Sequence, residues 1–170
     1  MTARRRLVLV RHAKAEPFAV TDHDRDLTDH GRSEAHAAGS YLQERSVLPD
    51  HAVVSSAVRT RSTWEAMEQA MGSGAQVSYD AACYSGGAEV VLELLRYVPE
   101  EARVVLFVGH QPTVGHLAHL LDDGGADHEA LHLMLQGFPT SSMAFFEVEG
   151  PWESLGSDAG RLVDFRRGDA

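Results

Sequence analysis

The chain has 170 residues, a length that favours one domain, residues 1–170, over two. Its formal net charge of -10 argues against a nucleic-acid-binding surface, because a polyanion is bound by a concentrated basic face. The single cysteine, Cys83, excludes an internal disulfide and is compatible with a reducing, cytoplasmic location, where we expect a buried thiol.

The first element in the chain is an apolar run over residues 7–10 that ends at Arg11 and His12. An unbroken run of valine and leucine predicts a strand that is covered on both faces in a parallel sheet. Arginines precede the run, as in a signal peptide, but the run is too short and meets Arg11 and His12 instead of a cleavage site. No other segment is long and apolar enough to span a bilayer, so we expect no membrane partner.

The rest of the chain alternates between candidate helices and strands, which predicts an α/β layer structure with a mostly parallel sheet. A polar, acidic loop over residues 14–27 precedes a helix that Thr28 caps. The predicted helices cover residues 28–45, 56–72, 88–98 and 112–121, and the further strands cover residues 51–55, 76–79, 103–108, 142–148 and 162–165. We expect the last two strands to be antiparallel at an edge.

A second apolar run, residues 104–108, leads to another histidine, His110. If this strand and the first one are neighbours, His12 and His110 converge at the carboxyl end of the sheet, where such folds bind ligands. Arg11 would add a permanently charged guanidinium that suits the oxygens of a phosphate. The pattern predicts a two-histidine active site for phosphoryl chemistry, locally positive in an acidic chain.

Three motifs follow three strands in order: Arg-His-Ala at residues 11–13, Ser-Ser-Ala-Val-Arg-Thr at 55–60 and Val-Gly-His-Gln-Pro at 108–112. This ordered set resembles the histidine phosphatase superfamily from residue 7 to about residue 146. The short chain, the Arg-His-Ala-Lys-Ala opening and the Asp-Arg-Asp-Leu-Thr segment at 24–28 are most similar to SixA-like phosphohistidine phosphatases. The resemblance implies a phosphoglycerate mutase-like fold, a three-layer sandwich with helices on both faces of a mostly parallel sheet.

The resemblance also implies the roles of the site residues. His12 would accept the phosphoryl group, and Arg11, Arg59 and His110 would surround its oxygens. We expect Gln111 and Arg25 to take part in substrate binding. A neutral imidazole, with a reference pKa of about 6.5, can attack phosphorus at neutral pH, and the phosphohistidine formed splits one transfer into two easier ones. No metal or other cofactor is needed for this reaction.

A general acid is the least defined part of the predicted site. Many members of the superfamily that cleave phosphate esters carry a carboxylic acid in an insertion between the second motif and the last histidine. In this chain that region, residues 81–89, is short, and Glu89 is the only carboxylate near its middle. Glu89 also suits the first turn of a helix, where it complements the helix dipole. Asp22 and Asp24 in the acidic loop are further candidates. An imidazole leaving group needs a proton less than an alcohol does, which favours phosphohistidine as the substrate.

Other histidines suggest a metal site only weakly. His116 and His119, and then His128 and His132, have spacings that place each pair on one face of a helix. No cysteine cluster or His-Glu-x-x-His signature accompanies them, and a metal needs three or four converging ligands. We therefore expect solvent-exposed histidines and no metal.

The sequence leaves three functions open. The first is a phosphatase acting on phosphohistidine, in a protein or as a small phosphoramidate. The second is a small-molecule phosphomonoesterase, in which Glu89 or a loop aspartate would serve as the acid. The third is a non-catalytic phosphate-binding module, which the presence of His12 makes less favoured.

Overall fold

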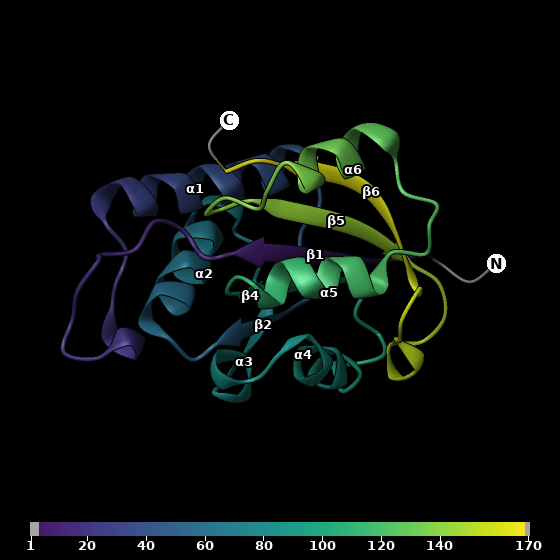
Figure 1. The fold of residues 1–170 in the computed structure, drawn as a ribbon, viewed down its shortest axis with the longest axis horizontal. Coiled ribbons are helices and arrows are strands. Elements are labelled where there is room, and N and C mark those ends of the chain that lie inside the picture. Colours follow the sequence, from purple (N-terminus) through teal and green to yellow (C-terminus); the bar gives the residue numbers. More distant parts are fainter. Residues whose placement is uncertain (1–3, 169–170) are drawn as a thin grey trace.

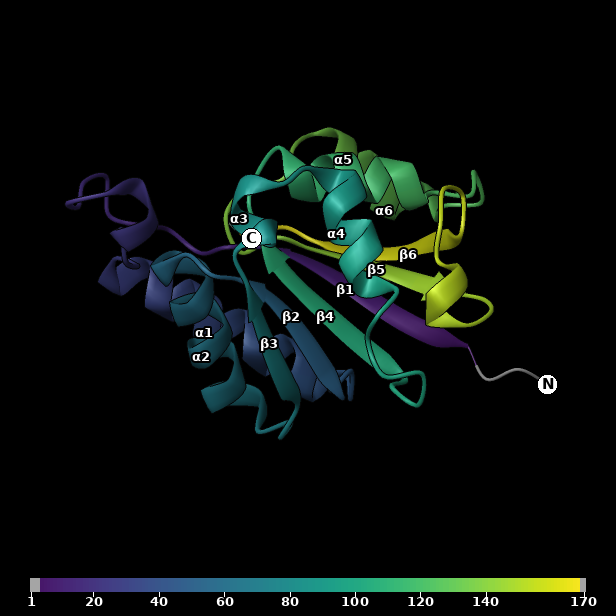
Figure 2. The ribbon, with the colours of Figure 1, turned by 90° about the horizontal axis from the view of Figure 1, so that it is seen from below.

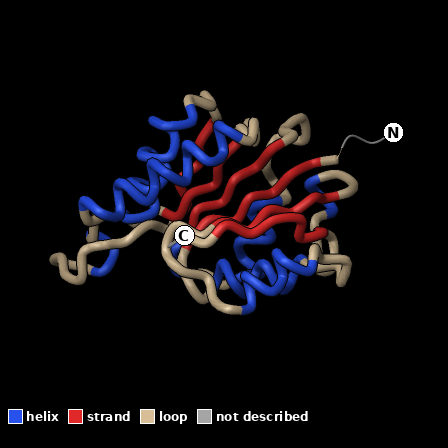
Figure 3. Tube along the Cα trace, turned by 90° about the horizontal axis from the view of Figure 1, so that it is seen from above, coloured by secondary structure: helices blue, strands red, loops and turns tan. Residues whose placement is uncertain are grey.

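The structure is a computed structural model that describes residues 4–168. Its centre is a sheet with helices on either side (Figure 3). The sheet has six strands in the order β3-β2-β4-β1-β5-β6. Strands β3, β2, β4 and β1 are parallel, whereas β5 and β6 pair antiparallel at one edge, as the sequence predicts. The strands are β1 (Arg5–Arg11), β2 (His51–Ser55), β3 (Gln76–Asp80), β4 (Val104–Gly109), β5 (Met143–Val148) and β6 (Gly160–Arg166).

Helices cover both faces of the sheet, which confirms the predicted three-layer sandwich. One face carries α1 (Asp29–Glu44) and α2 (Val58–Met71) (Figures 1 and 2). The other face carries α4 (Ala88–Leu95), α5 (Thr113–Leu121) and α6 (His128–Leu135), with the short α3 (Ala82–Ser85) beside them. Two 3-10 turns, η1 (Asp22–Asp24) and η2 (Trp152–Ser154), lie in the loops. None of the helices between residues 4 and 168 has the length and hydropathy that crossing a bilayer requires.

The side chains of β1 explain why its apolar run is unbroken. Leu7 and Leu9 belong to the core cluster under α4, α5 and α6, whereas Val8 and Val10 belong to the cluster under α1 and α2. Successive side chains of a strand point to opposite faces, so a strand between two helical layers must be apolar at every position. Burying each of these side chains contributes about 1.5–3 kcal/mol to folding.

Helices α1 and α2 pack very closely because α1 has a glycine at the contact. A Cβ on Gly39 would overlap the backbone carbonyl of Met67 in α2, so only glycine allows this approach. Thr28 caps α1 as predicted, because its hydroxyl oxygen accepts from the amide of Gly31 at 2.9 Å.

The structure corrects several predicted boundaries. Helix α4 ends at Leu95 instead of residue 98, and α5 begins at Thr113, after Pro112. The 3-10 turn η1 lies in the stretch predicted as a loop, and the short helix α3 lies where no element is predicted. Helices of three or four residues carry no detectable periodicity.

Candidate active site

The register of β1 and β4 brings the two predicted histidines together. The strands are parallel neighbours and Arg11 pairs with Gly109, so His12 and His110 leave the sheet side by side. Their ring centroids are 5.4 Å apart. Both follow carboxyl ends of strands, the edge at which parallel sheets bind ligands.

The ring of His12 is held with one nitrogen free. The residue is buried, with 9% of its surface exposed. Its Nδ1 lies 2.7 Å from the carbonyl oxygen of Ala13, which can only accept, so Nδ1 donates the proton. The amide of Ala13 in turn donates to the hydroxyl oxygen of Thr63 in α2 at 3.0 Å, which fixes this turn. A neutral His12 therefore carries its lone pair on Nε2.

His110 is oriented by the end of a third strand. Its Nε2 lies 2.7 Å from the hydroxyl oxygen of Ser55, the last residue of β2 and fully buried. Its Nδ1 is buried and has no protein partner. The rings of Tyr84 and His110 are in T-shaped contact, with centroids 5.6 Å apart. One nitrogen of His110 is thus tied to the fold, and the other is available to a ligand.

The two arginines predicted to surround the phosphoryl oxygens, Arg11 and Arg59, repeat this arrangement. Nη1 of Arg11 donates to the carbonyl oxygen of Phe138 at 2.9 Å. Arg59, in the first turn of α2, donates from Nη1 to the backbone oxygen of Asp22 at 2.9 Å and from Nη2 to its carboxylate at 3.1 Å. In both arginines Nε is buried without a protein partner. Unsatisfied buried donors are costly, so these groups indicate an anion site.

A pocket of about 290 Å³ lies between these residues. Every predicted catalytic or substrate-binding residue lines it, including Arg25 and Gln111, together with Lys14, Ala15 and Thr140. The complete lining is Arg11, His12, Lys14, Ala15, Arg25, Arg59, His110, Gln111 and Thr140. It includes Lys14 and three arginines, so the pocket is strongly positive although the chain is acidic overall.

The environment keeps both imidazoles neutral at neutral pH. Burial, followed by the charges of Arg59 and Arg11, lowers the pKa of His12 to about 4. Burial, followed by the proximity of His12, lowers the pKa of His110 to about 3. Both rings therefore stay neutral well below pH 7, and the Nε2 lone pair of His12 is available as a nucleophile.

The three candidate acids lie outside the pocket lining. Glu89 is exposed in the first turn of α4, and Asp24 is exposed and accepts from the hydroxyl of Thr21 at 2.7 Å. Asp22 is nearer, because it contacts Arg59. The Tyr84 hydroxyl, which donates to Asp22 at 2.7 Å, and the nearby arginines hold the pKa of this carboxyl well below its usual range. The geometry argues against Asp22 as a proton donor and favours a role in holding arginines.

Several residues around the site carry no sequence motif that predicts their contacts. Tyr84 lies in a stretch for which no element is predicted, yet it contacts both Asp22 and His110. His23 stacks edge-on against Tyr84 and bonds to the Ser56 hydroxyl through Nε2 at 2.9 Å. The sequence alone could have pointed to Ser55, because this residue ends a buried strand and belongs to the second motif. In the structure that strand, β2, lies beside β4.

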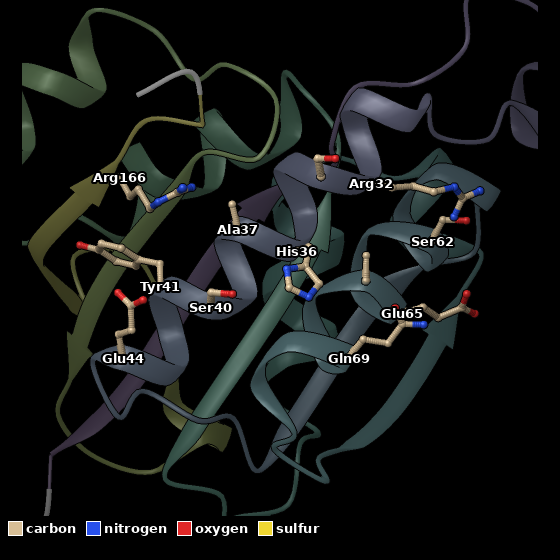
Figure 4. Close-up of a pocket in the computed structure, with 12 residues that line it drawn as sticks. Arg32, His36, Ala37, Ser40, Tyr41, Glu44, Ser62, Glu65, Gln69 and Arg166 are labelled. Atoms are coloured by element: carbon tan, nitrogen blue, oxygen red, sulfur yellow. The ribbon is translucent and has the colours of Figure 1, made fainter.

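A larger hollow of about 790 Å³ lies between the outer faces of α1 and α2 (Figure 4). Its side chains are mixed, with Arg32, His36, Glu44 and Glu65 among them, and none of the predicted site residues lines it. Size alone would favour this hollow as the functional site. The chemistry favours the smaller pocket, because the paired imidazoles and the unpartnered guanidinium donors lie there.

The remaining histidine pairs do not assemble a metal site. His116 and His119 lie on α5, and His128 and His132 on α6. In the part of the chain from residue 4 to residue 168, no three histidine, cysteine, aspartate or glutamate side chains are grouped so that they could hold an ion.

Comparison with known proteins places this site in a family. The family model of the histidine phosphatase superfamily (branch 1) matches residues 7–82, which include His12 and Arg59. An uncharacterised protein of Mycobacterium leprae is 30% identical, with 92% of this chain and 98% of that protein covered.

Two solved structures extend the likeness to the whole fold. A protein of Nakamurella multipartitia, assigned as a phosphohistidine phosphatase SixA, is 34% identical with a TM-score of 0.86, and the match covers 98% of each chain. A protein of Agrobacterium tumefaciens, also assigned as a phosphohistidine phosphatase SixA, is 32% identical with a TM-score of 0.79. The match covers 95% of this chain and 97% of that one. The ordered motifs, the fold and these relatives agree, and the chain belongs to the SixA-like branch of the histidine phosphatase superfamily.

Proposed function

We propose that this phosphatase removes the phosphoryl group from phosphohistidine and carries it transiently on His12. One observation supports the proposal above all others. Four side chains line the pocket and share one arrangement: those of His12, His110, Arg11 and Arg59. Each is tied to the protein by at least one nitrogen and leaves another without a protein partner or with a free lone pair. Nε2 of His12 is then the nucleophile, and Arg11, Arg59 and His110 supply the hydrogen-bond donors around it.

The first step is an in-line displacement at phosphorus. Nε2 of His12 attacks, a new P–N bond forms, and the P–N bond to the substrate imidazole breaks. The bonding pair returns to the leaving ring, which departs neutral when its other nitrogen is protonated. Arg11, Arg59 and Nδ1–H of His110 stabilise the negative charge on the equatorial oxygens. In the tautomer that this step needs, Nε2 of His110 accepts from the hydroxyl of Ser55, 2.7 Å away, and the proton is on Nδ1.

The second step regenerates the enzyme. Water attacks the phosphorus of phospho-His12, the P–N bond breaks, and inorganic phosphate leaves. The bonding pair returns to Nε2, and His12 becomes neutral again while Nδ1 keeps its hydrogen bond to Ala13. Arg25 and Gln111, which also line the pocket, bind the substrate around the phosphoryl group. The chemistry uses protein groups alone, and we propose that it is independent of metal.

The choice of phosphohistidine over a phosphate ester depends on the acid. An alkoxide leaving group has a pKa far above neutral and needs a proton from the enzyme. None of the residues lining the pocket, all within the described range 4–168, is a carboxylic acid. The imidazole of phosphohistidine leaves without such a donor, so this substrate fits the groups that are present. The alternative, a small-molecule phosphomonoesterase, would require Glu89, Asp22 or Asp24 to move into the pocket as the acid.

The test is a trapping experiment with a donor of each class. Phosphoimidazole and a sugar phosphate are each mixed with the protein in excess EDTA, and the reaction is quenched in alkali, in which phosphohistidine survives. With phosphoimidazole, we expect the phosphoryl group to be found on His12 and inorganic phosphate to be released. A phosphoryl group on His110 instead of His12 would reverse the assigned roles of the two histidines. Faster turnover of the sugar phosphate than of phosphoimidazole would favour the phosphomonoesterase. The variant His12→Ala should bind phosphate without turnover; if the unmodified protein does the same, the chain is a binding module.

A further inference from the structure

Two large apolar side chains are nearly fully exposed on one loop. Phe18 is 87% exposed and Val20 is 98% exposed, more than Tyr97 at 78% or Leu135 at 64%. We call Phe18 and Val20 the apolar tip. Scattered exposed apolar residues are ordinary, but two of them at the end of one projecting loop form a surface that can bury area against a partner.

The base of this loop is firmly held. Ala15 and Leu27 form an antiparallel bridge, and the amide of Glu16 donates to the carbonyl oxygen of Asp26 at 2.8 Å. Arg25 clamps the same turn, because its Nη1 donates to the carbonyl oxygen of Glu16 at 2.9 Å. The apolar tip is therefore mounted on a fixed frame, and a partner that binds it orders little additional chain.

The loop also borders the proposed active site. Lys14 and Ala15 before the tip, and Arg25 after it, line the pocket, whereas Phe18 and Val20 do not. The loop projects from the body at the end of the molecule to which β1 points (Figures 1 and 2). A small substrate that fills the pocket leaves the tip in water. A macromolecule that inserts a side chain into the pocket brings its own surface beside the tip.

We propose that the apolar tip docks the protein that carries the phosphohistidine, by packing against apolar side chains next to that residue. The inference rests on the proposed function and adds the partner's chemistry: a folded protein with an exposed apolar surface beside its phosphorylated histidine. The net charge of -10, and the carboxylates of Glu16 and Asp24 on the same loop, disfavour a nucleic acid or an anionic bilayer in this position.

The test compares two substrates with three variants of the whole chain. Phosphoimidazole reports on the pocket alone. A panel of folded proteins, each with one surface histidine phosphorylated by phosphoramidate, reports on docking. Phe18→Ser and Val20→Ser alter the tip. Tyr97→Ser is the matched control, because Tyr97 is also a large and mostly exposed aromatic residue but lies before β4, at the opposite end of the strands.

We expect the wild-type chain to hydrolyse at least one phosphoprotein with a higher kcat/KM than phosphoimidazole. Phe18→Ser should lower that value about tenfold through KM, as for loss of one apolar contact in an interface, and leave phosphoimidazole turnover within about twofold. Tyr97→Ser should change neither.

Several results would overturn the docking role while the proposed function stands. These are hydrolysis of phosphoimidazole with no preference for any phosphoprotein, equal losses on both substrates, or a phosphoprotein rate that the tip variants leave unchanged. A dimer that Phe18→Ser converts to monomer, or binding of the wild-type chain to phosphatidylglycerol vesicles through the tip, would assign the surface to another partner. If neither phosphoimidazole nor any phosphoprotein is hydrolysed but a sugar phosphate is, the proposed function itself fails.

Discussion

The buried, neutral state of His12 makes a quantitative prediction about acid stability. The ring has a pKa of about 4 in the folded chain, against about 6.5 in an unfolded one. As the pH falls below about 6.5, the unfolded chain binds a proton that the folded chain refuses, so the free energy of unfolding decreases. The loss accumulates between about pH 6.5 and about pH 4 and levels off below that range.

The magnitude follows from the difference between the two pKa values. Each pKa unit corresponds to about 1.4 kcal/mol, so on going from about pH 7 to about pH 4.5 this one residue removes roughly 2–3 kcal/mol of stability. That amount is a large part of the total for a domain of ordinary stability, about 5–15 kcal/mol. His12→Asn cannot take up the proton and should lose that much less stability over the same interval.

The measurement is urea unfolding of both proteins at about pH 7 and about pH 4.5, in buffers without phosphate, since a bound anion would favour the protonated ring. Carboxylates titrate in both proteins, and their effect cancels in the comparison. His128→Asn serves as the control because His128 is exposed at the start of α6 and should behave as the wild type. If the wild type and His12→Asn lose equal stability, His12 is not held neutral by its burial, and its assignment as a ready nucleophile fails.

Three further predictions concern single side chains. Asp22→Asn removes the carboxylate that orients Arg59, and kcat/KM for phosphoimidazole should fall about tenfold. The melting temperature should stay within about 2 °C, because the Asp22 side chain is exposed and the buried Arg59 keeps its hydrogen bond to the Asp22 backbone oxygen. Unchanged kinetics would show that Arg59 is oriented without the carboxylate. Ser55→Ala removes the hydroxyl that contacts Nε2 of His110. We expect kcat/KM for phosphoimidazole to fall roughly 10–100-fold with little change in the circular dichroism spectrum. A rate within about twofold of wild type would refute the assignment of the His110 proton to Nδ1. Gly39→Ala should destabilise the chain by roughly 1–3 kcal/mol in urea unfolding, since the new Cβ meets the Met67 carbonyl; equal stability would mean that α1 and α2 can separate freely.

The sequence by itself determined the layers of the fold and the residues at the strand ends. The valine- and leucine-rich runs at residues 7–10 and 104–108 can be stable only between two apolar layers, which predicts β1 and β4 in the middle of a covered sheet. A chain that leaves such a strand must place its next polar residue at the sheet edge. For that reason the positions of His12, Arg11 and His110 followed from local pattern, and the resemblance added Arg59.

Only the tertiary structure decided how these groups are held and what they face. The parallel register of β1 and β4 sets the 5.4 Å separation of the imidazoles, and Ser55 reaches His110 because β2 lies next to β4. The contacts of Asp22 with Arg59 and Tyr84 join segments 37 and 62 residues apart. Periodicity and motif spacing describe neighbours along the chain, whereas such contacts depend on how the loops fold across the sheet edge. The exposure of Phe18 and Val20 could not be predicted for the same reason. A sequence pattern does not tell whether an apolar residue in a loop packs against the protein or faces solvent.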